Sequence, residues 1–150
     1  MGYRNVVVGT DGSETAERAV AHAAEVAKTF GARLTIVTAY VHDKVKEAKN
    51  VNALPSEFAW MAADVNEAEA RAKRGKALAK QLGVKDVVVR TGAADPALAL
   101  IEAAEAGGGD LIVTGNRGIT QATRAIKGNV PNKVSHHAPC DVLIVHTTDG

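Results

Sequence analysis

Five short apolar runs are spaced along the 150 residues, with longer segments between most of them. The runs are Val6 to Val8, Leu34 to Ala39, Val87 to Val89, Leu111 to Val113, and Val142 to Val145. Continuous apolar runs are typical of parallel strands that are buried on both faces. Because parallel strands require right-handed crossover connections, the spacing predicts an α/β fold: an open, doubly wound, five-stranded parallel sheet, Rossmann-like, with helices on both faces.

The first two long connections carry helix signals. After Ser13, which can cap a helix, small or apolar residues recur every three or four positions and predict one buried face: Ala16, Ala19, Val20, Ala23, Ala27 and Phe30. Gly31 is suited to end this helix. The stretch from Pro55 to Leu82, rich in Ala, Glu, Lys and Arg, predicts a long exposed helix that ends at Gly83, after a loop over His42 to Leu54.

Two further helices are predicted in the second half of the chain. Asp95 and Pro96 form an N-cap and first-turn pair for a helix over Ala97 to Ala106, which the three glycines at 107–109 would stop. A short last helix is predicted from Val130 to His137. His136 and His137 are adjacent, so on a helix they point about 100° apart and do not predict a metal site.

Charge and cysteine content limit the partners and the compartment. Lys and Arg number 18 against 17 Asp and Glu, a net charge of +1, so no broad basic surface for nucleic acid or an anionic membrane is expected. No apolar stretch has signal-peptide length or approaches the ~20 residues of a membrane span. Cys140 is the single cysteine and is predicted to be a small core residue. We therefore predict one cytoplasmic domain over 1–150, with no nucleic-acid or membrane partner.

An acidic side chain follows the first predicted strand, in the sequence Gly9-Thr10-Asp11-Gly12-Ser13. Ligands of open α/β sheets bind outside the carboxyl ends of the strands, where the strand order reverses, so this loop and the residues after Ala39 and Val113 are candidate positions. Asp11 has two interpretations. It is either a turn aspartate bonded to its own backbone, or a carboxylate that accepts a hydrogen bond from a ribose hydroxyl or holds a metal.

The fourth predicted strand leads into a glycine segment: Gly115-Asn116-Arg117-Gly118, then nine residues, then Gly128-Asn129-Val130 at the start of the last helix. Glycines let backbone amides approach phosphate oxygens, and a helix N-terminus adds unpaired donors and the positive end of its dipole. Arg117, Arg124 and Lys127 add positive charge. The segment therefore predicts an anion cradle that faces Asp11.

This segment resembles the G-x2-G-x9-G-(S/T) nucleotide loop of the universal stress protein family. The resemblance extends to VVVGTDGSETAERAV at the start, GGDLIVTGNRG in the middle and GNVPNKVSHHAPCDVLIVHT at the end, and it leaves about residues 42 to 70 without a distinctive match. It implies an adenine nucleotide alpha hydrolase-like fold that binds adenine nucleotides. It also implies a homodimer made through the last strand, Val142 to Val145.

The resemblance also implies which residues hold the nucleotide. Asp11 would contact the ribose, and Ala39 would contact adenine. Gly9 and Thr10, in the same loop as Asp11, are also predicted to bind the nucleotide. The glycine loop would wrap the phosphates with Gly115, Arg117, Gly118, Gly128, Asn129 and Val130. One residue departs from the family pattern, because Asn129 stands where the family has Ser or Thr. Asn129 lacks the hydroxyl that can approach a metal. The predicted ligand is therefore ATP, AMP or cyclic AMP, either with or without Mg²⁺.

Three functions follow. The leading hypothesis is a regulatory adenine-nucleotide-binding protein of the stress response, which acts by binding and dimerising and is not a fast enzyme. The second is a slow ATP hydrolase in which Asp11 holds a metal; no general base is evident beside the glycine loop, so no catalytic residue is assigned. The third is a scaffold with an empty site, which the presence of all three loop glycines disfavours.

Overall fold

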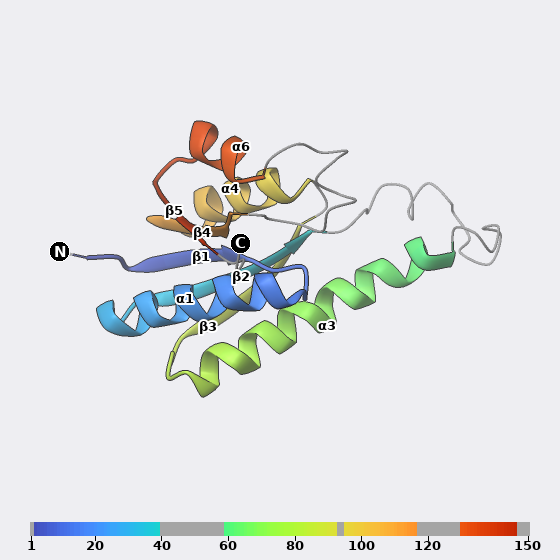
Figure 1. Cartoon of the computed structure of the whole chain (residues 1–150), viewed down its shortest axis with the longest axis horizontal. Coiled ribbons are helices and arrows are strands. Elements are labelled where there is room, and N and C mark those ends of the chain that lie inside the picture. Colours follow the sequence, from blue (N-terminus) through green and yellow to red (C-terminus); the bar gives the residue numbers. More distant parts are fainter. Residues whose placement is uncertain (1, 40–58, 93–94, 117–129, 147–150) are drawn as a thin grey trace.

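The computed structural model describes residues 2–39, 59–92, 95–116 and 130–146 (Figure 1). Side chains of the long helix are described from residue 67. The elements are β1 (Asn5–Gly9), α1 (Glu14–Phe30), β2 (Arg33–Ala39), α3 (Ala59–Gln81), β3 (Val87–Gly92), α4 (Pro96–Gly107), β4 (Leu111–Gly115), α6 (Val130–His137) and β5 (Asp141–Val145). Every predicted strand is confirmed, and so are the four predicted helices within the described residues. The predicted loop over His42 to Leu54 lies outside them.

The five strands form one parallel sheet in the order β3-β2-β1-β4-β5. The chain runs outward from β1 through β2 to β3, then crosses to β4 on the other side of β1 and ends at β5. Strand order therefore reverses between β1 and β4, where Val8 pairs with Val113. This is the open doubly wound arrangement that the sequence predicts, and its reversal point identifies where a ligand would bind.

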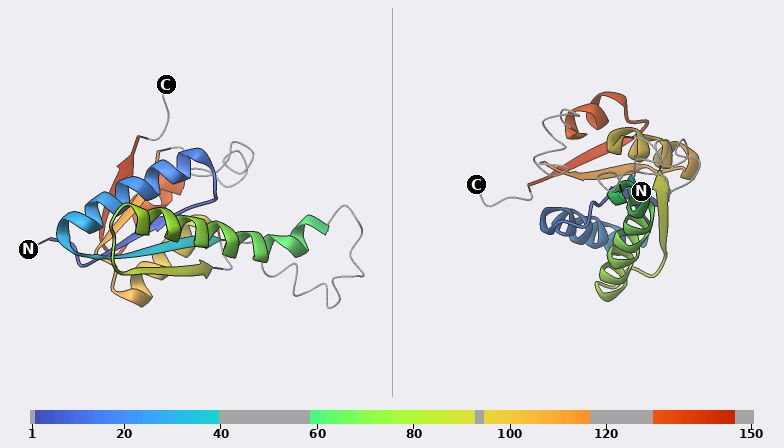
Figure 2. Two further views of the ribbon diagram at one scale, coloured as in Figure 1. Left: turned by 90° about the horizontal axis from the view of Figure 1, so that it is seen from below. Right: turned by 90° about the vertical axis from the view of Figure 1, so that its right-hand side faces the viewer.

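Helices cover both faces of the sheet and divide the core in two (Figures 1 and 2). One layer packs α1 and α3 on the sheet with buried residues such as Val20, Ala79 and Ile36. The other packs α4 and α6 around Leu100, Val134 and other small apolar side chains. The core therefore consists of closely layered Ala, Val, Ile and Leu, which suits a chain with only 3% aromatic residues.

The ends of α1 confirm the predicted caps and correct one side chain. Ser13 Oγ accepts a hydrogen bond from the Ala16 amide at 3.1 Å, and Gly31 ends the helix with φ +65°. Phe30 was predicted on the buried face, but it is 48% exposed and packs edge-on against the Tyr3 ring at 5.6 Å. The buried face ends at Ala27, because the last turn of α1 extends past the core, where Phe30 packs against Tyr3 and Gly2.

The caps of α4 also match the prediction. Asp95 Oδ1 accepts a hydrogen bond from the Leu98 amide at 2.9 Å, and Pro96 occupies the first turn. The helix runs one residue further than predicted at each end, and Gly108 caps it in the left-handed conformation at φ +68°. Asp95 therefore marks the start of α4, which belongs to the second helical layer.

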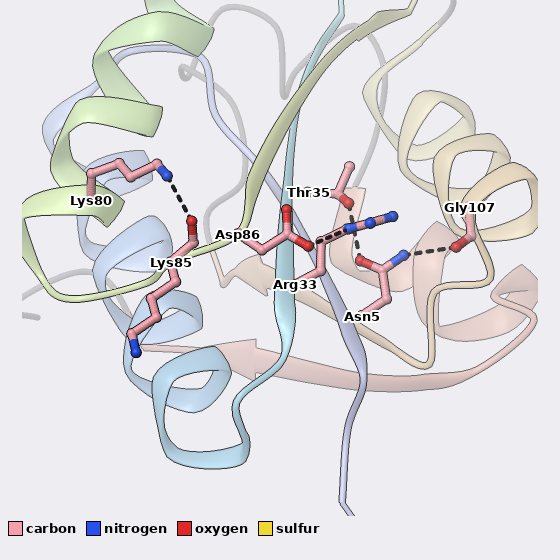
Figure 3. Close-up of polar contacts among 7 residues, drawn as sticks. All are labelled: Asn5, Arg33, Thr35, Lys80, Lys85, Asp86 and Gly107. Carbon is pink, nitrogen blue, oxygen red and sulfur yellow. Dashed lines mark hydrogen bonds and ion pairs between the residues drawn. The ribbon is translucent and has the colours of Figure 1, made fainter.

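Polar contacts tie the elements together at the opposite, amino-terminal edge of the sheet (Figure 3). Asn5 Nδ2 donates to the Gly107 carbonyl at 2.9 Å, and Thr35 Oγ1 donates to Asn5 Oδ1 at 3.0 Å. Arg33 Nε forms an ion pair with Asp86 Oδ2 at 3.0 Å. These contacts join β1, β2, the entry to β3 and the end of α4. The polar side chains at this edge therefore stabilise the fold.

Gly109, between α4 and β4, is expected to tolerate no side chain. A Cβ there would lie 2.8 Å from Val7 Cγ2 and 3.0 Å from Ala104 Cα, both in tightly packed positions. We expect Gly109→Ala to lower the free energy of unfolding by about 1 to 3 kcal/mol through overpacking, measured by urea denaturation. Gly107→Ala is the control, because its Cβ would meet two side-chain nitrogens at ordinary contact distances, Asn5 Nδ2 at 3.4 Å and Arg90 Nη1 at 3.7 Å. Equal stability of the two variants would contradict this account.

Within the described residues, no helix combines the length and the apolar character that crossing a membrane requires.

Candidate functional site

The carboxyl edge of the sheet brings together the predicted residues that the structure describes. Gly9 ends β1 and leads to Thr10 and Asp11, Ala39 ends β2, and Gly115 ends β4. Because β1 is paired in parallel with β2 on one side and β4 on the other, these strand ends lie side by side at one edge. The strand-end residues of the predicted site that the structure describes therefore lie at one edge of the sheet.

A network of short hydrogen bonds holds the turn that carries Asp11. Thr10 donates its amide to the Val37 carbonyl at 2.9 Å, and Thr10 Oγ1 accepts from the Gly12 amide at 3.1 Å. Asp11 Oδ1 accepts from the Ser13 amide at 2.9 Å. Gly12 has φ +81°, a left-handed conformation that favours glycine. The interpretation of Asp11 as a turn aspartate is thus correct for one of its two oxygens.

The second carboxylate oxygen, Asp11 Oδ2, is buried and has no hydrogen-bond partner among the described residues. Leaving a buried acceptor unpaired costs about 1 to 3 kcal/mol, and more for a charged group. Buried polar groups in native proteins are nearly always paired, with the protein itself or with ordered water or an ion. Asp11 therefore presents an acceptor that a donor from a ligand would satisfy, which is the property that the second interpretation requires.

Asn116 connects the exits of β4 and β5. Its amide donates to the Val145 carbonyl at 2.8 Å, and its side-chain Nδ2 lies 3.3 Å from His146 Nδ1. The sequence motif included Asn116 only as a residue between glycines, and it gave no sign of His146, because their proximity arises from strand pairing. These contacts hold the ends of β4 and β5 together.

Most of the glycine segment lies outside the described residues. This applies to Arg117, Gly118, Gly128 and Asn129, and also to the basic residues Arg124 and Lys127. The remaining candidate, Val130, is the first residue of α6 and is buried at 7% exposure. In the first turns of α6, Lys133 Nζ lies 3.9 Å from Asp95 Oδ2, so the start of α6 is paired with the start of α4.

A small hollow beside the Asp11 turn was not predicted from the sequence. Its wall is formed by α1, α3 and the turn itself, with the residues Thr10, Gly12, Glu17, Val20, Arg71, Arg74, Gly75 and Leu78. Arg71 and Arg74 occur in a helix rich in Ala, Lys and Arg, where nothing in the pattern distinguishes them from solvated residues. Only the packing of α3 across the sheet places them beside the turn.

Cys140 lies just before β5, at the amino-terminal edge of the sheet and not beside the Asp11 turn. Burial, together with the nearby Asp141 and Asp110 carboxylates, raises the pKa of the Cys140 thiol. A raised pKa lowers the thiolate fraction near neutral pH, so this cysteine is not an activated nucleophile. In the part of the chain that the structure describes, His, Cys, Asp and Glu side chains do not gather in threes where they could hold a metal ion.

Comparison with known proteins agrees with this architecture. The family model described as the universal stress protein family matches residues 2–146. The universal stress protein Rv1636 of Mycobacterium tuberculosis is 36% identical over 151 residues, which cover 97% of this chain and 98% of the relative. These matches extend over nearly the whole chain, including the region that carries no distinctive motif.

Solved structures are similar over the same length. One, described as a universal stress protein in complex with cAMP, has a TM-score of 0.73 and 32% identity and covers 99% of this chain and 100% of its own. Another, from Archaeoglobus fulgidus and described as a complex with dAMP, has a TM-score of 0.68 at 21% identity, covers 97% and 99%, and shows the shared fold. The resemblance predicted from the sequence is confirmed, and this chain belongs to the universal stress protein family.

Proposed function

We propose that this chain is a regulatory adenine-nucleotide-binding protein whose ligand lies at the carboxyl edge of the sheet, above β1, β2 and β4. The observation that carries the proposal is the buried Asp11 Oδ2, which has no partner among the described residues. A ribose hydroxyl is a neutral donor of the size that fits beside a turn. Its hydrogen bond to a carboxylate is of the stronger, charge-assisted kind.

The positions of the base and of the phosphates follow from the strands that flank β1 at this edge. With the ribose at Asp11, the base would lie toward Ala39 at the end of β2, and the phosphates toward Gly115 at the end of β4. On the family resemblance, the glycine segment from Gly115 to Val130 then supplies amides to the phosphates. The order of the strands supports this layout, since β2 and β4 flank β1 on opposite sides.

Cyclic AMP is the ligand that one specific observation favours. The solved relative described as a complex with cAMP is 32% identical over nearly the whole of both chains. Asn129 supports the same ligand from the sequence, since it replaces the hydroxyl residue that suits a metal-bound triphosphate. We propose cyclic AMP or AMP as better ligands than ATP.

We further propose that the protein acts by binding and not by turnover. Asp11 uses one oxygen for the Ser13 amide and leaves the other for a ligand hydroxyl, and the sequence shows no general base beside the glycine loop. At most, slow hydrolysis of ATP is expected. Steady release of phosphate that disappears in Asp11→Ala would favour the hydrolase alternative.

Dimerisation through β5 is part of the same proposal. β5 is the last strand in the sheet order, and Ile144 in it is 47% exposed. An edge strand with an exposed apolar residue is suited to pair with an antiparallel copy of itself. We propose a cytoplasmic homodimer with one continuous sheet.

Calorimetric titration of the intact protein with cyclic AMP, AMP, ATP and GMP tests the proposed ligand. We expect saturable binding of the three adenine nucleotides, tightest for cyclic AMP or AMP, with weaker binding of GMP. Failure of all the adenine nucleotides to bind would overturn the proposal and would leave the scaffold hypothesis.

A further inference from the structure

The long helix α3 lies directly against the turn that carries Asp11. A Cβ on Gly12 would be 2.8 Å from Arg71 Cγ and 3.1 Å from Arg71 Cδ, so the hydrocarbon stem of Arg71 covers this face of Gly12. The Arg74 guanidinium approaches the same position at 3.2 Å. Gly12 follows Asp11 in the chain, and its φ of +81° belongs to a conformation with few steric restraints for glycine.

Two features let α3 pack closely on the sheet beside the Asp11 turn. A Cβ on Gly75 would lie 3.3 Å from Ile36 Cγ2 and 3.8 Å from Thr10 Cγ2, so the absence of a side chain lets the helix approach β2 and the turn. Thr38 Oγ1, in β2, donates to the buried Ala68 carbonyl of α3 at 3.1 Å. The helix is therefore a fixed support for Arg71.

The charged end of Arg71 is engaged elsewhere. Its Nη2 lies 3.2 Å from Glu67 Oε2, one turn earlier on α3, in a pair whose side chains are 34% and 57% exposed. Such partly exposed pairs contribute little, typically about 0.3 to 0.5 kcal/mol. The stem and the charge of Arg71 therefore have separate contacts, and variants can remove one without the other.

We infer that Arg71 is a positioning residue for Asp11, and that its hydrocarbon stem, not its charge, keeps Asp11 Oδ2 in its buried orientation. Oδ2 has no described hydrogen-bond partner, so it would gain by turning toward water. The Ser13 amide holds only the other oxygen. The Arg71 stem lies against Gly12, the residue that follows Asp11 in the turn, and this contact is the restraint that we invoke. This inference rests on the proposed role of Asp11 as the ribose acceptor.

The test compares AMP with 2′,3′-dideoxy-AMP, which lacks the ribose hydroxyls. Arg71→Ala removes the stem, whereas Arg71→Met keeps most of it and removes the charge. We expect Arg71→Ala to weaken AMP binding by about threefold to tenfold, as part of a charged hydrogen bond is lost, and to leave binding of the dideoxy nucleotide unchanged. Arg71→Met and Glu67→Gln should both retain the wild-type preference for AMP.

Lys73→Ala is the matched control, because it truncates an exposed cation on the same helix that does not line the hollow. Alanine is the best helix former, so the truncated proteins should fold, and their melting temperatures check this. Equal loss of both nucleotides in Arg71→Ala, or a loss in Arg71→Met as large as in Arg71→Ala, would overturn the inference. Wild-type protein that binds no adenine nucleotide would instead overturn the proposed function, and the inference with it.

Discussion

Asp11→Asn is expected to lower the affinity for cyclic AMP and AMP by about 10-fold to 100-fold, because a hydrogen bond to a charged group contributes about 1.5 to 3 kcal/mol. The asparagine retains an oxygen for the Ser13 amide, which Asp11 Oδ1 now accepts at 2.9 Å, so the turn should be preserved. What changes is the second atom, where a buried, charged acceptor becomes a neutral amide donor. Calorimetric titration gives the affinity directly.

Stability measurements separate loss of the ligand contact from loss of the fold. Because the unpaired oxygen is a cost in the free protein, the urea midpoint of Asp11→Asn without nucleotide should equal or exceed that of the wild type. Asp95→Asn is the matched control: Asp95 also accepts a backbone amide with one oxygen, and it lies at the same edge of the sheet. It should change nucleotide affinity less than twofold. Unchanged affinity in Asp11→Asn would exclude Asp11 as the ribose acceptor.

Ile144→Pro is expected to convert the proposed dimer to a monomer of 15.6 kDa. The Val145 carbonyl accepts the Asn116 amide, so Val145 directs its backbone groups toward β4. Since these directions alternate along a strand, the Ile144 amide points to the open edge, and proline removes a donor that only a partner strand would use. Sedimentation equilibrium measures the mass.

Ile144→Ala serves as the control for this change, because it removes the exposed side chain and keeps the backbone donor. It should weaken the dimer less than proline does. Far-UV circular dichroism should show that Ile144→Pro keeps its helices and strands, since proline is tolerated on edge strands. A dimer mass that is unchanged in Ile144→Pro would exclude β5 as the interface.

The boundaries of the elements could be predicted because their signals are local. Ser13 and Asp95 each cap a helix through a bond to an amide three residues later, and Gly31 ends one in a left-handed conformation. These effects involve neighbours along the chain, so the sequence contains them directly. Phe30 shows the limit of such reasoning: its helical spacing is correct, but the core does not extend far enough to bury it.

The site could be predicted in part. The positions of Asp11, Ala39 and Gly115 after apolar runs were sufficient to assign them to one edge, because all strands of a parallel sheet end on the same side. The state of Asp11 was not predictable from the sequence: one oxygen accepts the Ser13 amide, and the other is buried without a partner among the described residues. Arg71 carried no signal, because its contact with Gly12 joins residues far apart in the sequence.

By itself, the sequence determined the five strands, their helical connections, the caps and the membership of the family, all of which depend on spacing and residue type along the chain. The tertiary structure alone decided the strand order, the burial of Asp11 Oδ2 and the packing of α3 on the turn. The physical reason is that burial and side-chain contact depend on which distant segments pack together, and the periodicity of one segment does not specify its neighbours.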